Sequence, residues 1–143
     1  MSDMKEADAV LARVQRIFET IPHGIRLGLE PVSYQQNALL IRLPYQAEIV
    51  GNSQQGFIHS GALSALVDQA SGVAVMLAID RPRSVATLDL RIDHLRPAKP
   101  ALPLYAQAEC YRMTRSIAFV RCVCFDESLA DPVAIGMSTF MHG

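Results

Sequence analysis

The stretch NSQQGFIHSGALSALVDQASGVAVMLAI, residues 52–79, joins a polar loop that contains glycine to a long apolar segment. One charged residue, Asp68, interrupts the apolar segment. At about 100° per residue, small and partly polar residues fall on the same helix face as Asp68, and larger apolar residues fall on the other. The Asp68 face holds Gly61, Ser64, Ala65, Ser71, Gly72 and Val75. We therefore predict a helix over roughly residues 60–79 that another group can approach closely beside Asp68.

A carboxylate in an apolar helix has two interpretations. Burying Asp68 is costly unless it is paired or takes part in chemistry. It is either a structural acid that hydrogen-bonds a neighbouring loop or a functional acid.

The composition restricts the classes of protein to which the chain can belong. With 143 residues, half of them hydrophobic, we expect a single domain over 1–143 that hides part of its surface in a homo-oligomer. A net charge of −1 without a basic block argues against a nucleic-acid partner. Three cysteines without paired spacing indicate reduced thiols in the cytoplasm, and Cys122 and Cys124 read as core residues. We expect no metal and no cofactor.

The charged beginning of the chain lacks the apolar region of a signal peptide. The apolar stretch over residues 61–79 has the length of a membrane span, but Asp68 and Gln69 disfavour insertion. We therefore expect a cytoplasmic protein that does not enter a membrane.

The remaining pattern predicts an α+β fold in which an antiparallel sheet wraps one central helix. An amphipathic helix is predicted over residues 8–20, within an N-terminal segment 1–22 that Pro22 and Gly24 end. Strands are predicted at 28–34, 38–43, 85–94, 104–113, 117–125 and 133–141. In the strand over 85–94, Leu88, Leu90 and Ile92 alternate with Thr87 and with three charged residues, which predicts two opposite faces.

Three motifs, in this order, resemble the hotdog-fold acyl-CoA thioesterases, including the phenylacetate-catabolism and hydroxybenzoyl-CoA thioesterase groups. His59-Ser60-Gly61, with Asp68 nine residues after the histidine, is similar to the family's loop-to-helix signature. The stretch TLDLRI (87–92) with LRPA (95–98) resembles the family's strand after the central helix, and AIGMSTF (134–140) resembles its closing strand. The resemblance covers residues 24–142 and implies the hotdog fold.

The sequence departs from the family pattern at two positions. Ser60 replaces the first glycine of the usual His-Gly-Gly. The family's asparagine precedes the histidine by six residues, whereas Asn52 precedes His59 by seven and Ser53 stands at the family spacing. The loop role of Asn52 or Ser53 therefore stays open.

The resemblance implies hydrolysis of an acyl-CoA thioester. Asp68 acts as general base or as nucleophile, and the backbone N–H groups of Ser60 and Gly61 at the helix N-terminus hold the oxyanion. Thr87 helps to hold the water or is an ordinary strand residue. Asn52 binds the thioester carbonyl or shapes a turn. Helix N-capping by Ser60 is compatible with its oxyanion role.

Further residues are assigned to substrate binding. The resemblance gives His59 mainly the role of orienting the loop, in which Gly56 also lies. Basic side chains are candidates for contacts with the CoA phosphates, although most could simply be solvated: Arg81, Arg83, Arg91, Arg96, Lys99, Arg112 and Arg115. Arg96, Arg112 and Arg115 are the ones that we assign.

Two other functions compete with a thioesterase. A hotdog dehydratase or hydratase resembles this chain less, because those enzymes place a histidine and an acid further apart than His59 and Asp68. A hotdog protein that only binds acyl-CoA is disfavoured by Asp68. The high apolar content and the helix face of small residues predict a homodimer or a homotetramer. In similar proteins the active site lies between two subunits, with the loop from one chain and the acid from the other. We expect the same arrangement here.

Overall fold

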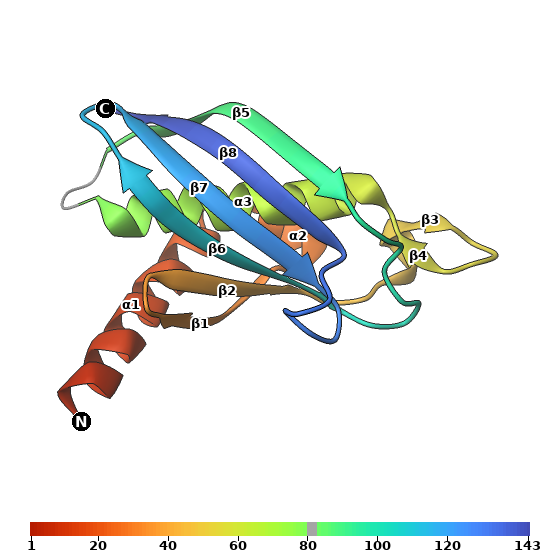
Figure 1. The fold of residues 1–143 in the computed structure, drawn as a ribbon. Helices are drawn as coiled ribbons and strands as arrows, with labels where there is room; N and C mark the ends of the chain where they lie inside the picture. The colour runs from red at the N-terminus through yellow and green to blue at the C-terminus, as the bar shows by residue number, and fades with distance from the viewer. Residues whose placement is uncertain (80–82) are drawn as a thin grey trace.

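The structure, a computed structural model, describes residues 1–79 and 83–143. Two helices begin the chain, and a hairpin, a short irregular region and a long helix follow (Figure 1). Four long strands complete it. The elements are α1 (Ser2–Phe18), α2 (Pro22–Leu27), β1 (Glu30–Gln35), β2 (Ala38–Leu43), a 3₁₀ turn (Ala47–Ile49), β3 (Val50–Asn52), β4 (Phe57–Ile58), α3 (Ser60–Ala78), β5 (Val85–His94), β6 (Leu104–Met113), β7 (Ile117–Phe125) and β8 (Ala134–His142).

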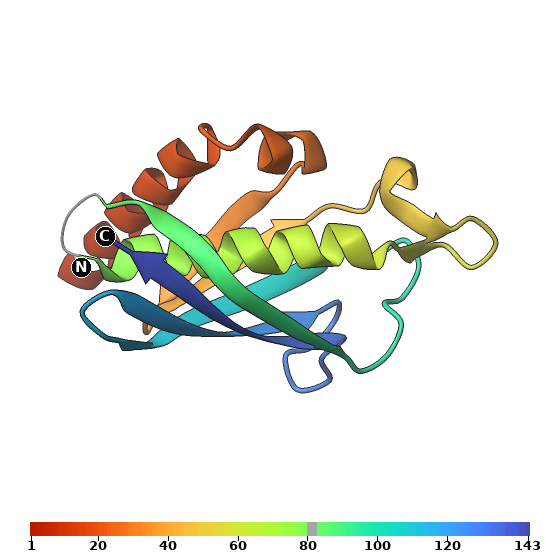
Figure 2. The same cartoon turned by 90° about the horizontal axis from the view of Figure 1, so that it is seen from above.

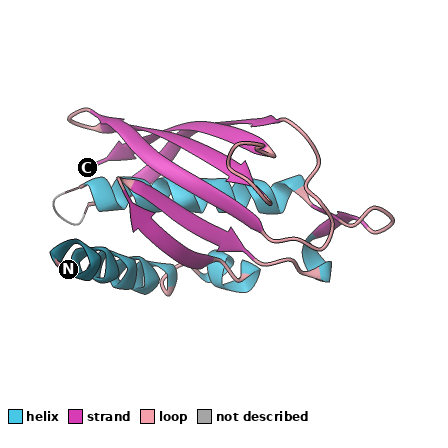
Figure 3. Ribbon diagram, turned by 60° about the horizontal axis from the view of Figure 1, so that its bottom comes forward, coloured by secondary structure: helices cyan, strands magenta, loops and turns pink. Residues whose placement is uncertain are grey.

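Six strands form one antiparallel sheet in the order β1-β2-β6-β7-β8-β5, and β3 pairs with β4 in a separate hairpin. The sheet is strongly twisted and curves over α3, as Figures 1 and 3 show. β1 and β5 are its two edges. The predicted α+β architecture, an antiparallel sheet around one central helix, is confirmed.

The core lies between α3 and the concave face of the sheet. Alternate residues of the central strands are buried there, and many of them are small, which lets the sheet come close to the helix. They include Leu39 and Ile41 of β2, Ala106 and Ala108 of β6, and Val120, Cys122 and Cys124 of β7. Cys122 and Cys124 are core residues, as predicted. Burial raises the pKa of the Cys122 thiol to about 12 and also raises that of Cys124, so both stay protonated.

The sheet covers more of α3 than the sequence predicted. Ser71 and Val75, which we placed on the open Asp68 face, are fully buried. The side of α3 that remains open to a cavity includes Ala65, Asp68 and Gly72. α3 is also long and apolar enough to cross a membrane, but half of its most apolar window is buried inside the domain. That burial is typical of a core helix.

The N-terminal segment contains two helices where one was predicted. α1 ends at Phe18, before Pro22 as predicted, but it begins at Ser2 and not at residue 8. Pro22 then begins α2, because a proline at the first helical position loses no hydrogen bond. Gly28, with φ of +76°, ends α2 in the left-handed conformation that glycine adopts without strain. α1 buries Val14 and Phe18 against the domain, and the Arg13 guanidinium donates to the Met76 carbonyl of α3 at 3.3 Å.

Candidate active site

Asp68 and Thr87 lie opposite each other on α3 and β5. The Thr87 hydroxyl donates a hydrogen bond of 2.8 Å to Oδ1 of Asp68. The strict alternation predicted for the strand placed Thr87 on the face opposite Leu90 and Ile92. A β-bulge between Thr87 and Asp89 breaks that alternation, so Thr87 faces α3 while Leu88 is 53% exposed. The bulge therefore brings the hydroxyl to the carboxylate.

The two residues line a cavity of about 360 Å³. Its wall is formed by the open side of α3, by β5 and β8, and by the segment at the start of α2. The lining residues are Ile21, His23, Ala65, Asp68, Gln69, Gly72, Val73, Met76, Val85, Thr87 and Phe140. A mostly apolar cavity with a few polar groups, one of them a carboxylate, is typical of a small-molecule site.

The helix N-terminus of α3 differs from the prediction in its cap. His59, not Ser60, is the N-cap residue, and its Nδ1 accepts a hydrogen bond of 2.8 Å from the Gly61 N–H. A neutral His59 therefore carries its proton on Nε2. Within the described chain no acceptor takes the Ser60 N–H, because Ser60 is the first residue of the helix. Of the two predicted oxyanion donors, Ser60 is the one whose N–H is not engaged by any described residue, because the Gly61 N–H is bonded to His59.

The loop before α3 is a tight turn. The side-chain oxygen of Asn52 accepts from the N–H groups of Gln54 and Gln55 at 3.0 and 3.2 Å. Gly56, with φ of +75°, donates its N–H to the Asn52 carbonyl at 2.7 Å and accepts from the Tyr45 hydroxyl at 3.1 Å. Asn52 therefore shapes the turn. Among the described residues, its side-chain NH₂ group has no hydrogen-bond acceptor. Ser53 lies inside the same turn.

The loop and the acid are far apart in one chain. A helix rises 1.5 Å per residue, so Asp68 lies about 12 Å along α3 from Ser60. The β3–β4 hairpin projects beyond the end of the sheet, away from the middle of α3 (Figures 1 and 2). One thioester carbonyl cannot contact both groups of the same chain.

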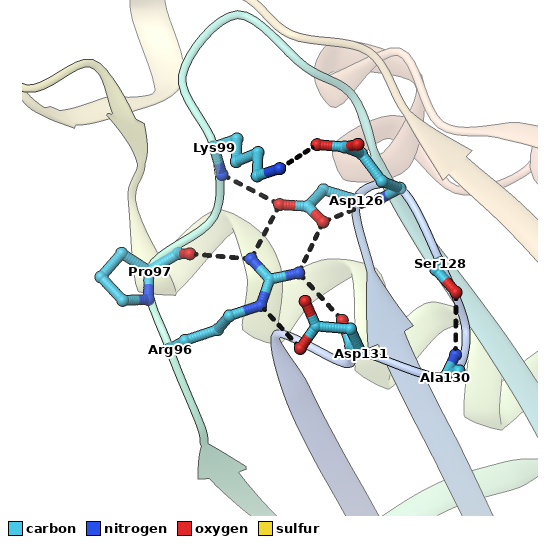
Figure 4. A network of polar contacts seen from close by, with 8 residues as sticks. Arg96, Pro97, Lys99, Asp126, Ser128, Ala130 and Asp131 are labelled. Atoms are coloured by element: carbon cyan, nitrogen blue, oxygen red, sulfur yellow. Dashed lines mark hydrogen bonds and ion pairs between the residues drawn. The ribbon is translucent and has the colours of Figure 1, made fainter.

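Arg96, assigned to substrate binding, is instead held in an ion-pair network (Figure 4). Its guanidinium donates to both oxygens of Asp126, at 2.7 and 3.0 Å, and also contacts the side chain and carbonyl of Asp131. The fully buried Asp126 carboxylate accepts two further bonds, from the N–H groups of Lys99 and Glu127. The network joins the β5–β6 loop to the β7–β8 turn, which accounts for Arg96 without a substrate.

The other basic side chains are scattered. Arg112 and Arg115 are exposed on β6 and in the β6–β7 turn, at the end of the sheet opposite the β3–β4 hairpin (Figure 1). Arg91 pairs with Asp93 at 3.2 Å, and Lys99 pairs with Glu127. Arg81 lies outside the described residues. Among the described residues, no three His, Cys, Asp or Glu side chains are grouped so that they could hold a metal ion.

The Asp126 network predicts a pH-dependent stability. Asparagine at position 126 keeps the shape but loses the charge that Arg96 faces, and we expect Asp126→Asn to cost about 3 kcal/mol of unfolding free energy at pH 7. Arg96 lowers the pKa of Asp126 from its ordinary 3.8, so this stabilisation exists above that pH and is lost as the pH falls below it. The Tm difference between wild type and variant should therefore shrink on acidification.

The exposed pair of Lys99 and Glu127 in the same loops provides the control. Glu127→Gln should change the Tm little at any pH, because a solvated pair stabilises weakly. Equal Tm values for wild type and Asp126→Asn at pH 7 would contradict the role given to the network.

Of the residues that line the cavity, only Asp68 and Thr87 were assigned to the site from the sequence, and Ile21, His23 and Gln69 are among those that were missed. Ile21 and His23 are distant in sequence from Asp68, and Gln69 looks like an ordinary polar residue beside it. The Gln69 carboxamide lies on Gly24 of α2, where a Cβ would overlap its side-chain oxygen. The helical period around Asp68 could have indicated Gln69, but nothing local indicated the two residues from the start of α2.

Comparison with known proteins confirms the predicted family. Residues 55–132, more than half of the chain, match the model of the thioesterase superfamily. The chain belongs to this superfamily, and its fold is the hotdog fold.

Three similar proteins extend the match. A Halobacterium salinarum protein, VNG_1336C, which is named only as a candidate esterase, is 30% identical over 94% of this chain and 93% of its own length. The medium/long-chain acyl-CoA thioesterase YigI of Escherichia coli is 28% identical over 69% of this chain and 73% of its own. A crystal structure of a Pseudomonas aeruginosa protein superposes with a TM-score of 0.84 at 34% identity, covering 92% of this chain and 98% of that one.

Proposed function

We propose that the protein is an acyl-CoA thioesterase that releases a free acid and CoA. The observation that carries the proposal is the Asp68 carboxylate, bonded to Thr87, at the wall of a mostly apolar cavity. Membership of the thioesterase superfamily and the similarity to an acyl-CoA thioesterase support it. An apolar cavity fits the acyl group, and a carboxylate supplies the base that hydrolysis needs.

In the proposed reaction Asp68 takes a proton from water while the water oxygen attacks the thioester carbonyl. Thr87 binds one oxygen of the carboxylate, so the other oxygen can face the water. The carbonyl oxygen becomes an oxyanion, which the Ser60 N–H stabilises at the positive end of the α3 dipole. The intermediate then expels the CoA thiolate, which takes up a proton, and leaves the carboxylic acid.

Asp68 can also act as the nucleophile. Its oxygen would attack the carbonyl and expel CoA, and water would then hydrolyse the resulting mixed anhydride. A single turnover in H₂¹⁸O detects the nucleophilic route when water enters at the Asp68 carboxyl carbon. General-base catalysis places ¹⁸O in the acid released by the first turnover, whereas attack by Asp68 with water entering at its own carboxyl carbon places the label in Asp68.

The active site is proposed to form between two subunits of a homodimer. The Ser60 N–H and the Asp68 carboxylate are too far apart along α3 to act on one carbonyl within a chain. β5, which carries Thr87, is an exposed edge of the sheet. Pairing of two β5 edges about a two-fold axis would cover the edges and bring the loop of one chain toward the acid of the other.

A panel of acyl-CoA esters, assayed for free thiol, tests the proposal. A thioesterase releases thiol, whereas a dehydratase, a hydratase or a protein that only binds acyl-CoA does not. Thiol release from at least one ester, saturable in substrate, is the expected result. No thiol release across short, medium, long and aromatic acyl groups from a folded protein would overturn the proposed function.

A further inference from the structure

The cavity beside Asp68 has a wall that the thioesterase family model does not describe. The family match begins at residue 55, yet Ile21 and His23 line the cavity together with Asp68. Both come from the junction of α1 and α2. This part of the wall is thus formed by the N-terminal segment, outside the residues that the family model matches.

Several contacts fix α2 at this position. Gly24 is buried, and its lack of a side chain lets α2 approach the Gln69 carboxamide on α3. The Gln46 side chain donates to the Leu27 carbonyl at 2.6 Å, which ties the C-terminal end of α2 to the loop after β2. Pro22 holds the residue before it, Ile21, in an extended conformation. Because these contacts hold α2 at Gly24 and at Leu27, the distance between α2 and α3 is defined.

The direction of the chain places Ile21 relative to Asp68. In Figure 2 the chain passes from α1 through α2 toward the end of the molecule where α3 begins, so α2 and α3 run in opposite directions. Because Gly24 lies on Gln69, Ile21 precedes that contact on the side toward the C-terminus of α3. Val73, Met76, Val85 and Phe140 line the same cavity, and Met76 is two turns beyond Asp68. The polar end of the cavity is therefore at Asp68, and its apolar part extends toward Met76.

We propose that α2 with Ile21 is the roof of the acyl-chain site and that Ile21 sets the longest acyl chain accepted. This inference rests on the proposed thioesterase function. The acyl carbonyl lies at Asp68, and an unbranched aliphatic chain extends along α3 beneath the roof toward Met76. Acyl chains longer than the apolar part contact Ile21 and α2, so kcat/KM falls sharply beyond that length.

The test is the dependence of kcat/KM on acyl length, from acetyl-CoA upward in steps of two carbons. Each methylene that enters the apolar part should raise kcat/KM about fourfold until the roof is reached. Ile21→Trp fills the space beneath the roof and should reduce kcat/KM for the longest good substrate by at least about tenfold more than it reduces kcat/KM for acetyl-CoA. Ile21→Ala should move the limit to longer chains.

Ile25, on α2, gives a matched control for Ile21, which precedes that helix. It is 57% exposed and lies outside the cavity lining, so Ile25→Ala should leave the length profile unchanged. Profiles of both Ile21 variants that coincide with wild type would overturn the inference. If Ile21→Trp fails to fold, Ile21→Ala decides alone.

A binding measurement keeps this inference separable from the proposed function. S-alkyl-CoA thioethers cannot be hydrolysed, and calorimetry gives their Kd as a function of chain length. If the Ile21 variants change the longest S-alkyl chain that binds, but the protein releases no thiol, the role of Ile21 is supported and the thioesterase function is rejected. Thiol release with a length limit that does not respond to Ile21 would support the thioesterase and reject the roof.

Discussion

Asp68→Asn is expected to reduce kcat for thioester hydrolysis by about 10²–10⁴-fold while leaving the fold intact. Asparagine has nearly the same shape, and its side-chain oxygen can still accept the hydrogen bond that Thr87 donates to position 68. It cannot take a proton from water or form an anhydride. Both routes considered for Asp68 therefore fail in this variant, and steady-state kinetics with the best acyl-CoA ester measures the loss.

The Tm of the same variant separates catalysis from structure. If Asp68 were only a structural acid, Asp68→Asn would lower the Tm and leave kcat close to the wild-type value. Asp8→Asn is the control, because Asp8 is an exposed acid on α1, remote from the cavity lining. It should change neither kcat nor Tm.

Ser60→Pro is expected to lower kcat by about 10²–10³-fold, the usual effect of losing one oxyanion donor. Proline lacks the N–H but is favoured at the first position of a helix. His59, which precedes it, is already extended, with φ of −62° and ψ of 138°. The variant should therefore fold with α3 unchanged, and circular dichroism with kinetics checks both points.

Ser60→Gly and Ser60→Ala keep the backbone N–H and should retain turnover. The Ser60 hydroxyl is not required in this account, since the donor is the main chain. Loss of turnover in a folded Ser60→Ala protein would move the role to the hydroxyl and contradict the oxyanion assignment.

The strands of the sheet were well predicted because their residues alternate. β2, β5, β6 and β7 have the predicted bounds, and β8 differs by one residue at each end. Alternation failed at Thr87 and Leu88, where the bulge shifts the register by one residue. A bulge depends on the pairing with β8, which a single strand does not reveal.

The site was predicted in part. The Asp68 and Thr87 positions implied by the family resemblance do meet in the structure, at hydrogen-bond distance. The sequence does not show which arginines are free to bind a substrate. Arg96, which we assigned to substrate binding, forms an ion pair with Asp126, 30 residues away. Ile21, which helps to line the cavity, was missed for the same reason: packing of α2 on α3 decides its position.

We propose that one chain of a dimer supplies Asp68 and that its partner supplies the Ser60 N–H. Asp68→Asn and Ser60→Pro chains with different affinity tags, expressed together, allow dimers that carry both tags to be purified. In such a dimer one of the two sites combines an intact Asp68 with an intact loop, so about half of the wild-type kcat per dimer should return although both parents are inactive. Mixed dimers as inactive as the parents, or no recoverable doubly tagged species, would contradict the account.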